Sequence, residues 1–252
     1  FTAIGILVGV RLSLYLANIV GYDYDDAYTL ALVGVPSGII GARLLFVIEH
    51  WAFFSENPSE IIMITEGGIS IWGAILGGVG GALVFGLWKG YPVGRGLDIS
   101  SFGLILGQAI GRLGDLVNGE HLSRATDLPW GVIYTHKDSP AFAHSLVVGA
   151  HHPATTYELL GDLVIFSALF YLLFRLFWNK PGLTFFAYLA SYAVMRFMLT
   201  YLRVDSAETF LFDLRVPQLV SIIVVLGAVP FVWYFATHPP SNEATSRQNI
   251  FR

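Results

Sequence analysis

The sequence predicts an all-α membrane protein: a seven-transmembrane-helix bundle with an external segment between helices four and five. Hydrophobic residues make up 55% of the 252 residues and charged residues only 13%, whereas soluble domains carry roughly a quarter charged residues. The mean hydropathy is +0.64. The apolar residues form runs close to the ~20 residues that a helix needs to cross the hydrocarbon layer. One connection between these runs is much longer than the others.

The apolar runs define the expected helices in order. They are Ala3–Val20, Tyr28–Glu49, Ile69–Trp88, Ser100–Val117, Tyr157–Phe177, Leu183–Leu202 and Pro217–Phe235. The long connection is Asn118–Thr156, and a loop of this length is usually functional or folded in its own right. Its stretch PWGVIYT is a candidate short strand. We therefore expect a transmembrane domain over residues 1–236 and a polar, mobile tail over residues 237–252.

Glycine-rich stretches predict where these helices touch. The chain has 27 glycines, and they concentrate in GAILGGVGG (Gly73–Gly81) and GQAIG (Gly107–Gly111). Small residues let membrane helices approach closely. Lys and Arg are more frequent in the first, third and fifth connections and in the tail than on the opposite side. The positive-inside rule then predicts a cytoplasmic C-terminus, an external N-terminus and an external segment 118–156.

Composition also excludes several function classes. The net charge of -4 and the lack of a basic patch argue against nucleic-acid binding. The chain has no cysteine and its histidines lack a metal-ligand spacing, so we expect neither a metal nor another cofactor. No internal repeat of helix pairs is visible in the sequence, so an inverted-repeat transporter is not favoured. A retinal photoreceptor is excluded because the last apolar run has no lysine for a Schiff base.

The stretch GQAIGRLGDLVNGEH (Gly107–His121) places polar groups at the end of an apolar run. These groups are Arg112, Asp115, Asn118, Glu120 and His121. A charge at the centre of a membrane costs at least ~2.5–3.5 kcal/mol, so charged residues in such runs usually mark a functional site. Further ionisable residues within or at the ends of runs are Arg11, Arg43, Glu158, Asp162, Arg196 and Arg203.

Arg196, Thr200 and Arg203 follow the spacing i, i+4, i+7, which predicts one helical face. The two arginines of this face, together with Arg112, predict a cationic pocket. Guanidinium groups bind phosphate oxygens through two parallel hydrogen bonds. A phospholipid headgroup is the expected ligand. The alternative is an internal network of arginines and acids that only ties helices together. For Arg11, Arg43 and Arg203, a second alternative is that the side chain reaches the membrane interface.

Five motifs in order resemble one family. They are GARLLFVIEH (Gly41–His50), EGGISIWGAILGG (Glu66–Gly78), GRLGDLVNGE (Gly111–Glu120), HPATTYE (His152–Glu158) and RFMLTYLR (Arg196–Arg203). Together they resemble the prolipoprotein diacylglyceryl transferases over nearly the whole chain. The resemblance implies an enzyme of the bacterial inner membrane. Such an enzyme transfers a diacylglyceryl group from phosphatidylglycerol, or another anionic phospholipid, to the lipobox cysteine thiol in a prolipoprotein signal peptide.

The resemblance also implies residue roles. Arg112 would hold the lipid phosphate, Glu120 would support the site, and Arg196 would stabilise the departing phosphate. The expected lipid-binding residues are Arg112, Asp115, Asn118, Gly119, Trp72 and Arg203. His121 is a candidate catalytic base, because histidine titrates near neutral pH. The alternative for His121 is an exposed loop histidine.

Departures from the family pattern leave a second function open. The unusual residues are Ile4, Trp72, Asp115, Ser123 and Thr200, which stand where the family often has tyrosine, histidine, asparagine, glycine and an acid. The alternative is a catalytically inactive member that serves as a structural or lipid-binding subunit of a larger membrane complex. We expect Asp115 to pair with Arg112 or Arg196, because an unpaired carboxylate at this depth is costly.

Overall fold

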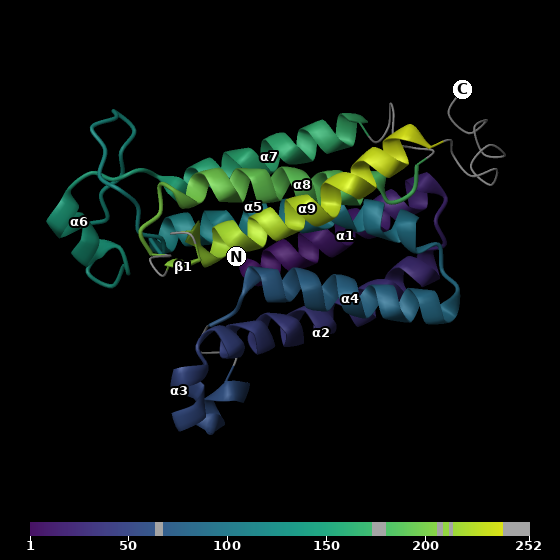
Figure 1. The fold of residues 1–252 in the computed structure, drawn as a ribbon, viewed down its shortest axis with the longest axis horizontal. Helices are drawn as coiled ribbons and strands as arrows, with labels where there is room; N and C mark the ends of the chain where they lie inside the picture. Colours follow the sequence, from purple (N-terminus) through teal and green to yellow (C-terminus); the bar gives the residue numbers. More distant parts are fainter. Residues whose placement is uncertain (64–67, 173–179, 206–208, 212–213, 239–252) are drawn as a thin grey trace. The chain divides into compact units, whose positions relative to one another are not determined.

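The computed structural model describes residues 1–63, 68–172, 180–205, 209–211 and 214–238. Over these residues the chain is mainly helical (Figure 1). The elements in order are α1 (Thr2–Val20), α2 (Tyr24–Glu49), α3 (Trp51–Glu56), η1 (Pro58–Ile62), α4 (Ile71–Lys89), α5 (Val93–Asn118), α6 (Phe142–Val148), α7 (Ala154–Leu172), α8 (Leu183–Thr200), β1 (Thr209–Leu211), β2 (Leu214–Arg215) and α9 (Val216–Thr237). The two short strands pair antiparallel.

A long helix lies on each of the predicted apolar runs. In the part of the chain that the structure describes, 6 helices are long and apolar enough to cross a membrane: α1, α2, α4, α7, α8 and α9. The prediction of an all-α, multi-pass membrane protein is confirmed at this level. Helix α5, on the fourth run, is not among the six, and it carries the buried polar residues Asp98, Ser101 and Arg112.

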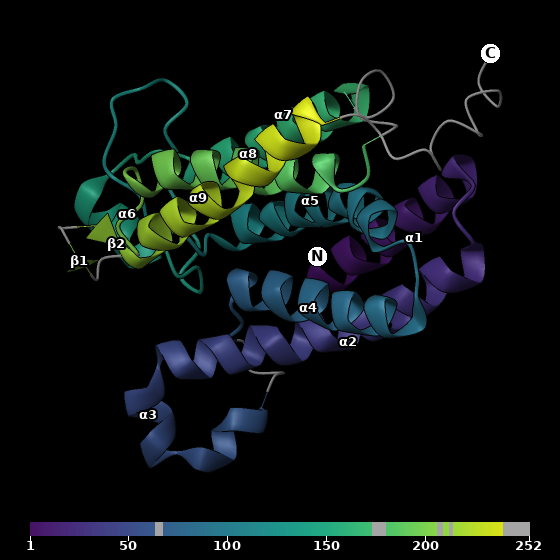
Figure 2. The same ribbon diagram turned by 45° about the vertical axis from the view of Figure 1, so that its right-hand side comes forward.

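The chain divides into two compact units, residues 13–97 and residues 1–12 with 98–252. In the larger unit, α8 packs against both α7 and α9, and α5 runs alongside them in both ribbon views (Figures 1 and 2). Its core includes Phe102 of α5, which makes edge-to-face contacts with Phe166 and Phe170 of α7. In the smaller unit, α2 packs along α4.

Glycines bring helices together within each unit. A Cβ atom on Gly73 of α4 would lie 2.3 Å from the carbonyl oxygen of Gly41 in α2, and one on Gly5 of α1 would lie 2.7 Å from that of Gly107 in α5. Gly73 and Gly107 therefore confirm the predicted close contacts, since a side chain at either interface would push the helices apart. A Cβ atom on Gly111 would meet nothing within 4 Å, so this glycine has no such role.

Arg43 of α2 binds the backbone of the connection between α3 and α4. Its side chain is buried, with Nε 2.8 Å from the Ile61 carbonyl oxygen and Nη1 2.8 Å from that of Gly68. It also lies over the rings of Phe46 and Phe54. A guanidinium has five N–H donors, and here several of them bind backbone carbonyls between α3 and α4. Arg43 therefore fixes this connection to α2.

The segment between α5 and α7 is folded, but the strand predicted over PWGVIYT is wrong. Val132 forms only an isolated antiparallel bridge with His151. A turn closed by the hydrogen bond from Gly131 N to the Leu128 carbonyl oxygen (2.9 Å) precedes it, so the extended part is too short for a strand. The segment contains α6 and lies at one end of the larger unit (Figure 1).

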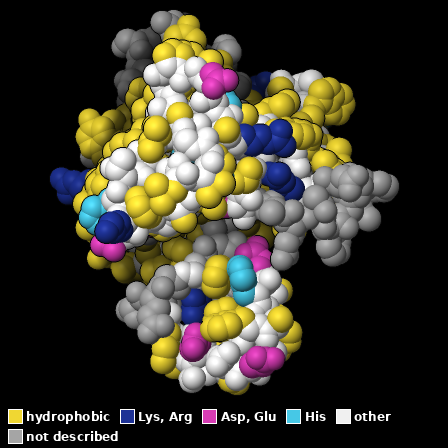
Figure 3. Space-filling model, turned by 90° about the vertical axis from the view of Figure 1, so that its left-hand side faces the viewer, with side chains coloured by type: hydrophobic (Ala, Val, Ile, Leu, Met, Phe, Trp, Pro, Cys, Tyr) yellow, Lys and Arg dark blue, Asp and Glu magenta, His cyan; other side chains and the backbone are white. Residues whose placement is uncertain are grey.

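Apolar side chains cover much of the surface. The space-filling view of one end shows yellow hydrophobic groups among white groups and charged side chains of both signs (Figure 3). Large exposed apolar residues include Leu7, Val164, Leu226 and Trp233. Contiguous apolar surface of this kind marks contact with lipid or another apolar partner. Residues 66–67 of the second motif, 173–177 of the fifth predicted run and 239–252 of the predicted tail lie outside the described residues.

Candidate functional site

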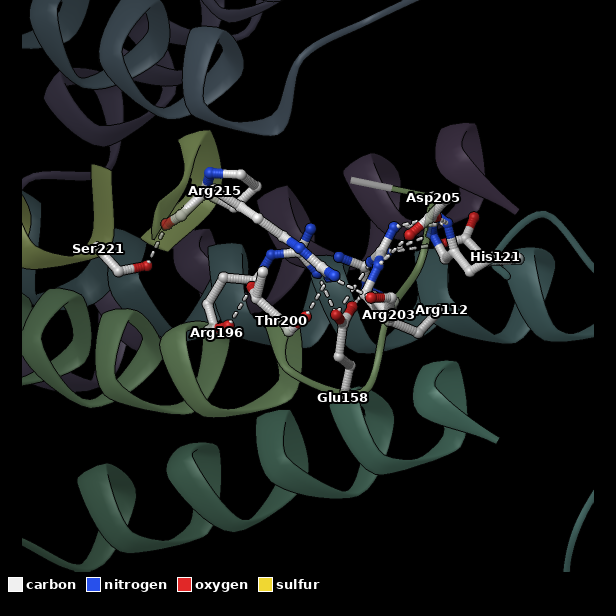
Figure 4. A network of polar contacts seen from close by, with 11 residues as sticks. Arg112, His121, Glu158, Arg196, Thr200, Arg203, Asp205, Arg215 and Ser221 are labelled. Carbon is white, nitrogen blue, oxygen red and sulfur yellow. Dashed lines mark hydrogen bonds and ion pairs between the residues drawn. The ribbon is translucent and has the colours of Figure 1, made fainter. Parts of the chain in front are cut away.

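Charged side chains from distant parts of the sequence meet at one end of the larger unit (Figure 4). Helices α5 and α8 end there and α7 begins there (Figure 1). The three elements thus place Arg112, Glu158 and Arg196 at the same level of the bundle. Arg203 and Asp205 follow α8 directly. We call Arg112, Asp115, His121, Glu158, Arg196, Arg203 and Asp205 the arginine cluster.

Glu158 is the centre of the arginine cluster. Its Oε2 lies 2.7 Å from Arg112 Nε and its Oε1 lies 3.1 Å from Arg203 Nη1. Oε1 also pairs with Arg196 Nη1. The Glu158 side chain is only 2% exposed, and a carboxylate so buried is tolerated only with close cationic partners. The structure thus brings Arg112 and Arg196 to one carboxylate, as the sequence predicted for a shared site.

Sequence reasoning did not include Glu158 among the site residues. The available signal was its position in HPATTYE, at the start of an apolar run. Charged residues in apolar runs usually mark a functional site. We used this rule for Arg112 and Arg196, and it applies equally to Glu158.

Asp115 pairs with Arg112, which confirms the predicted ion pair. Arg112 Nη1 donates to Asp115 Oδ2 over 2.7 Å, and the two residues are one helical turn apart in α5. The Nε atom of the same guanidinium contacts Glu158. Two carboxylates therefore hold Arg112 in a fixed orientation, and Asp115 is not an isolated negative charge.

His121 lies between two carboxylates. Its Nε2 is 3.3 Å from Asp115 Oδ2 and its Nδ1 is 3.0 Å from Asp205 Oδ2. Burial lowers the pKa of His121, and Arg203 and Arg112 lower it further, but the hydrogen bonds to Asp115 and Asp205 outweigh them and raise the pKa above its ordinary value. The side chain is 18% exposed, so His121 is part of the arginine cluster and not a free loop histidine.

Asp205 joins Arg203 to His121. Arg203 binds it through two parallel bonds, Nε to Oδ1 at 3.0 Å and Nη2 to Oδ2 at 2.6 Å. This fork geometry is strong and directional. Burial raises the pKa of the Asp205 carboxyl, but hydrogen bonds from His121 and Arg203 outweigh this and hold the pKa well below its usual range. Asp205 was not predicted as a site residue, because it follows the last apolar residues of a run.

Backbone contacts fix Arg203 beyond the end of α8. The prediction that Arg196, Thr200 and Arg203 share a helical face is wrong for Arg203, because α8 ends at Thr200. Arg203 instead forms an antiparallel bridge with Ser123, and its carbonyl oxygen accepts a hydrogen bond from Arg215 Nη1. Thr200 Oγ1 donates to the Arg196 carbonyl oxygen over 2.7 Å. Its side chain thus bonds its own helix.

Comparison with known proteins identifies relatives of this chain. The family model for prolipoprotein diacylglyceryl transferase matches residues 1–234. The chain belongs to this family. It is 36% identical over 249 residues to the phosphatidylglycerol–prolipoprotein diacylglyceryl transferase of Trichormus variabilis, covering 97% of this chain and 87% of the relative. It is 33% identical over 228 residues to the protein of that name from Clostridioides difficile, covering 90% and 85%.

The remaining residues expected from the diacylglyceryl transferase pattern lie outside the arginine cluster. Glu120 is exposed and accepts a hydrogen bond from Asn118 Nδ2 over 2.8 Å. Gly119 ends α5 with a positive φ of 69°. Trp72 lies in the first turn of α4, in the smaller unit. Among the described residues, no group of at least 3 histidines and acids is arranged to hold a metal ion.

Proposed function

We propose that this protein transfers a diacylglyceryl group from phosphatidylglycerol to the cysteine thiol of a prolipoprotein. The match to the diacylglyceryl transferase family over residues 1–234 supports the reaction. The observation that carries the proposal is the convergence of Arg112, Arg196 and Arg203 on Glu158 at one end of an apolar helical unit. A phosphate attached to a lipid requires such a cationic site within reach of the bilayer.

Arg112 and Arg196 are the proposed phosphate ligands. Each guanidinium has five N–H donors, and Glu158 and Asp115 orient them without using them all. Charge grows on the phosphate as the bond between its oxygen and the glycerol carbon breaks. Fixed cations directed at that charge stabilise the transition state. Arg112 then holds the lipid phosphate and Arg196 stabilises its departure.

His121 supplies positive charge in this proposal. The sequence offers it as a candidate base for the thiol proton. Its hydrogen bonds to Asp115 and Asp205 raise its pKa above its ordinary value, while its ring nitrogens also lie 2.7 Å from Arg203 Nη2 and 3.1 Å from Arg112 Nη1. With His121 protonated, as we propose, the arginine cluster has four cations against three carboxylates, an excess of one positive charge that matches a phosphodiester anion. A cationic field also favours the thiolate, which is the competent nucleophile.

The reaction exchanges one bond for another. The sulfur attacks the terminal glycerol carbon of the diacylglyceryl group, an S–C bond forms, and the C–O bond to phosphate breaks. Glycerol phosphate leaves with the bonding electrons on oxygen. Arg203 extends the phosphate site, and Asn118, Gly119, Glu120 and Trp72 are proposed to position the lipid or the peptide. Neither a metal nor another cofactor takes part in the proposed step.

We further propose a seven-span topology in the bacterial inner membrane. Helix α5 has 26 residues, and at ~1.5 Å per residue it is long enough to cross ~30 Å of hydrocarbon. Its polar groups then lie inside the bundle. The distribution of Lys and Arg supports a cytoplasmic C-terminus and an external segment 118–156. Residues 1–236 form the membrane domain in this proposal, and residues 237–252 form a tail.

The inactive-subunit hypothesis rested mainly on Asp115 and the other unusual residues. Asp115 is paired with Arg112, so it does not act as an isolated charge that repels phosphate. Thr200 does not interrupt the arginine cluster, because Glu158 already joins Arg196 and Arg203. Active transfer is therefore the better-supported function.

A direct assay tests the proposal. Purified protein is incubated with phosphatidylglycerol and a lipobox peptide, and the peptide mass is measured. The expected result is a mass increase of one diacylglyceryl group. Parallel reactions with phosphatidic acid or phosphatidylserine test lipid selectivity, and a peptide with serine in place of cysteine is the negative control. Folded protein that binds lipid without changing the peptide would decide for the inactive subunit.

A further inference from the structure

Asp162 is a buried carboxyl group that the proposed mechanism leaves unused. It lies in α7 and is only 1% exposed. Neither of its carboxylate oxygens accepts a hydrogen bond from the described residues. Asp162 follows Glu158 by four residues in the same helix, so both side chains project from the same face. It therefore lies one helical turn further into the bundle than the centre of the arginine cluster.

The groups around Asp162 belong to the same site. The charged and titratable residues that interact with it electrostatically are Arg112 of α5, Glu158 of α7, and Arg196, Tyr188 and Tyr192 of α8. The Tyr188 hydroxyl donates to Gln108 Oε1 over 2.9 Å, so its proton is directed away from Asp162. Buried Gln108 Nε2 also has no acceptor among the described residues. A polar region thus continues inward from the arginine cluster.

The missing hydrogen bonds indicate the protonation state of Asp162. An ionised carboxylate without donors is very costly to bury, whereas the neutral acid costs far less. Asp115, Glu158 and Asp205 each have a close cationic partner and are stable as carboxylates. Asp162 differs from all three. Of the acids around the cluster that the structure describes, Asp162 is the one placed to hold a proton.

The transfer reaction requires such a proton. The thiol loses its proton, and the leaving phosphate oxygen gains electrons as the C–O bond breaks. We propose that Asp162 is a neutral carboxylic acid at rest and donates its proton to that phosphate oxygen. The thiol proton passes to water before the attack, and the Asp162 carboxylate regains a proton from water after glycerol phosphate has left. The step balances: one S–C bond forms, one C–O bond breaks, and glycerol phosphate leaves with one proton.

Arg112 and Arg196 make this role physically consistent. Both interact electrostatically with Asp162, and both are the proposed phosphate ligands. They therefore place the proton acceptor near the donor and stabilise the Asp162 carboxylate during its short ionised period. Because this inference rests on the proposed transfer of a diacylglyceryl group, its test must separate failure of the donor role from failure of the transferase function.

The first experiment compares Asp162→Asn with wild type. Asparagine has the same shape as the neutral acid and cannot donate an acidic proton. The melting temperature and the KM for phosphatidylglycerol should stay close to wild type, while kcat falls by about 10²–10⁴-fold, the usual contribution of a general acid. The alkaline limb of the kcat–pH profile should disappear. Asp127→Asn, at an exposed position of the segment between α5 and α7, is the matched control. Wild-type kcat and pH profile in Asp162→Asn would overturn the donor role.

A second measurement does not require the variant to be active. Infrared spectroscopy of wild type without substrate should show the carbonyl band of a protonated carboxylic acid. The band should be absent in Asp162→Asn and remain in Asp127→Asn, and in wild type it should vanish at high pH with the same midpoint as the alkaline limb of kcat. No such band, or a different midpoint, overturns the proposal. If wild-type protein shows the band but lipidates no peptide, the transferase function is rejected, and the donor role with it. The protonated state of Asp162 would still stand.

Discussion

Arg112 Nε and Glu158 Oε2 lie 2.7 Å apart, although the whole segment between α5 and α7 separates the two residues in sequence. That segment must fold back before α7 can place its acid against the end of α5. The bridges of Ser123 with Arg203 and of Ala125 and Val132 with His151 hold it in this position. The segment is therefore part of the site's construction as well as the connection between two helices.

Replacing Glu158 should destabilise the protein strongly. Glu158→Ala removes the shared carboxylate of Arg112, Arg196 and Arg203 and leaves their charges buried without it. Breaking a buried ion pair in this way typically costs about 3–5 kcal/mol. Thermal unfolding in detergent measures the loss. Glu120→Ala is the comparison, because the Glu120 side chain is exposed and accepts a hydrogen bond from Asn118. Equal melting temperatures for the two variants would contradict the central role of Glu158.

Asp115→Asn and Arg112→Ala should differ sharply in activity. Asparagine at position 115 restores the usual family residue and still offers an oxygen to Arg112 Nη1, so peptide lipidation should change little. Arg112→Ala removes the proposed phosphate ligand and should abolish lipidation. Mass measurement of the lipobox peptide and the melting temperature are compared with wild type. The prediction fails if Asp115→Asn loses activity as completely as Arg112→Ala.

Stability should depend on pH through His121 and Asp205. The folded-state pKa of His121 is raised, so its contribution is fully present below the unfolded pKa of ~6.5 and is lost as pH rises through the folded value. The pKa of Asp205 is lowered, so its contribution is present above ~3.9 and is lost as pH falls toward the folded value. The hydrogen bonds and ion pairs of His121 and Asp205 should therefore stabilise the protein most between pH ~3.9 and pH ~6.5.

The measurement is the melting temperature of wild type and His121→Gln across this pH range. The stabilisation of wild type over the variant should be largest in mildly acidic solution and should shrink as pH rises above ~6.5. Glutamine keeps a polar side chain without titrating. A difference between the two proteins that stays constant with pH would show that the charge of His121 does not contribute.

The apolar runs predicted the long helices because membrane spans require a nearly continuous apolar sequence, a signal that depends on composition more than on tertiary contacts. Run lengths were less informative at the ends: α5 extends from Val93, well before the expected Ser100. Its first residues include Asp98, which accepts hydrogen bonds from the backbone N–H groups of Gly182 and Phe185. This contact with distant residues makes a polar side chain compatible with a buried helix, and no local pattern indicates it.

The site was predictable where charge inside an apolar run required compensation, as for Arg196 and for Arg112 with its partner Asp115. It was not predictable where partners come from outside regular elements. Arg203 and Asp205 follow the end of α8, and their positions depend on the bridge to Ser123 and on Arg215. Glu120 follows the turn at Gly119, and its exposed side chain accepts a hydrogen bond from Asn118, so its place in the signature did not predict its contacts.

Gly119 should tolerate alanine poorly. Its φ of 69° is unfavourable for residues with a Cβ atom, and such a Cβ would lie 2.3 Å from Ser139 Oγ and 2.7 Å from Tyr134 Cδ1. The Gly119 carbonyl oxygen also accepts a hydrogen bond from Ala141 N over 3.0 Å, just before α6. Gly119→Ala should therefore destabilise the protein by about 1–3 kcal/mol and displace the chain that leads to His121.

Gly111→Ala is the matched control for this prediction. Gly111 lies in α5, the helix that Gly119 follows, and a Cβ atom there would meet nothing within 4 Å. Alanine is also the better helix former by about 1 kcal/mol, so this variant should keep or slightly raise the melting temperature. Peptide lipidation should fall in Gly119→Ala and remain in Gly111→Ala, because only the former moves His121 relative to Asp115 and Asp205. If both variants melt and react like wild type, the turn at Gly119 does not position the arginine cluster.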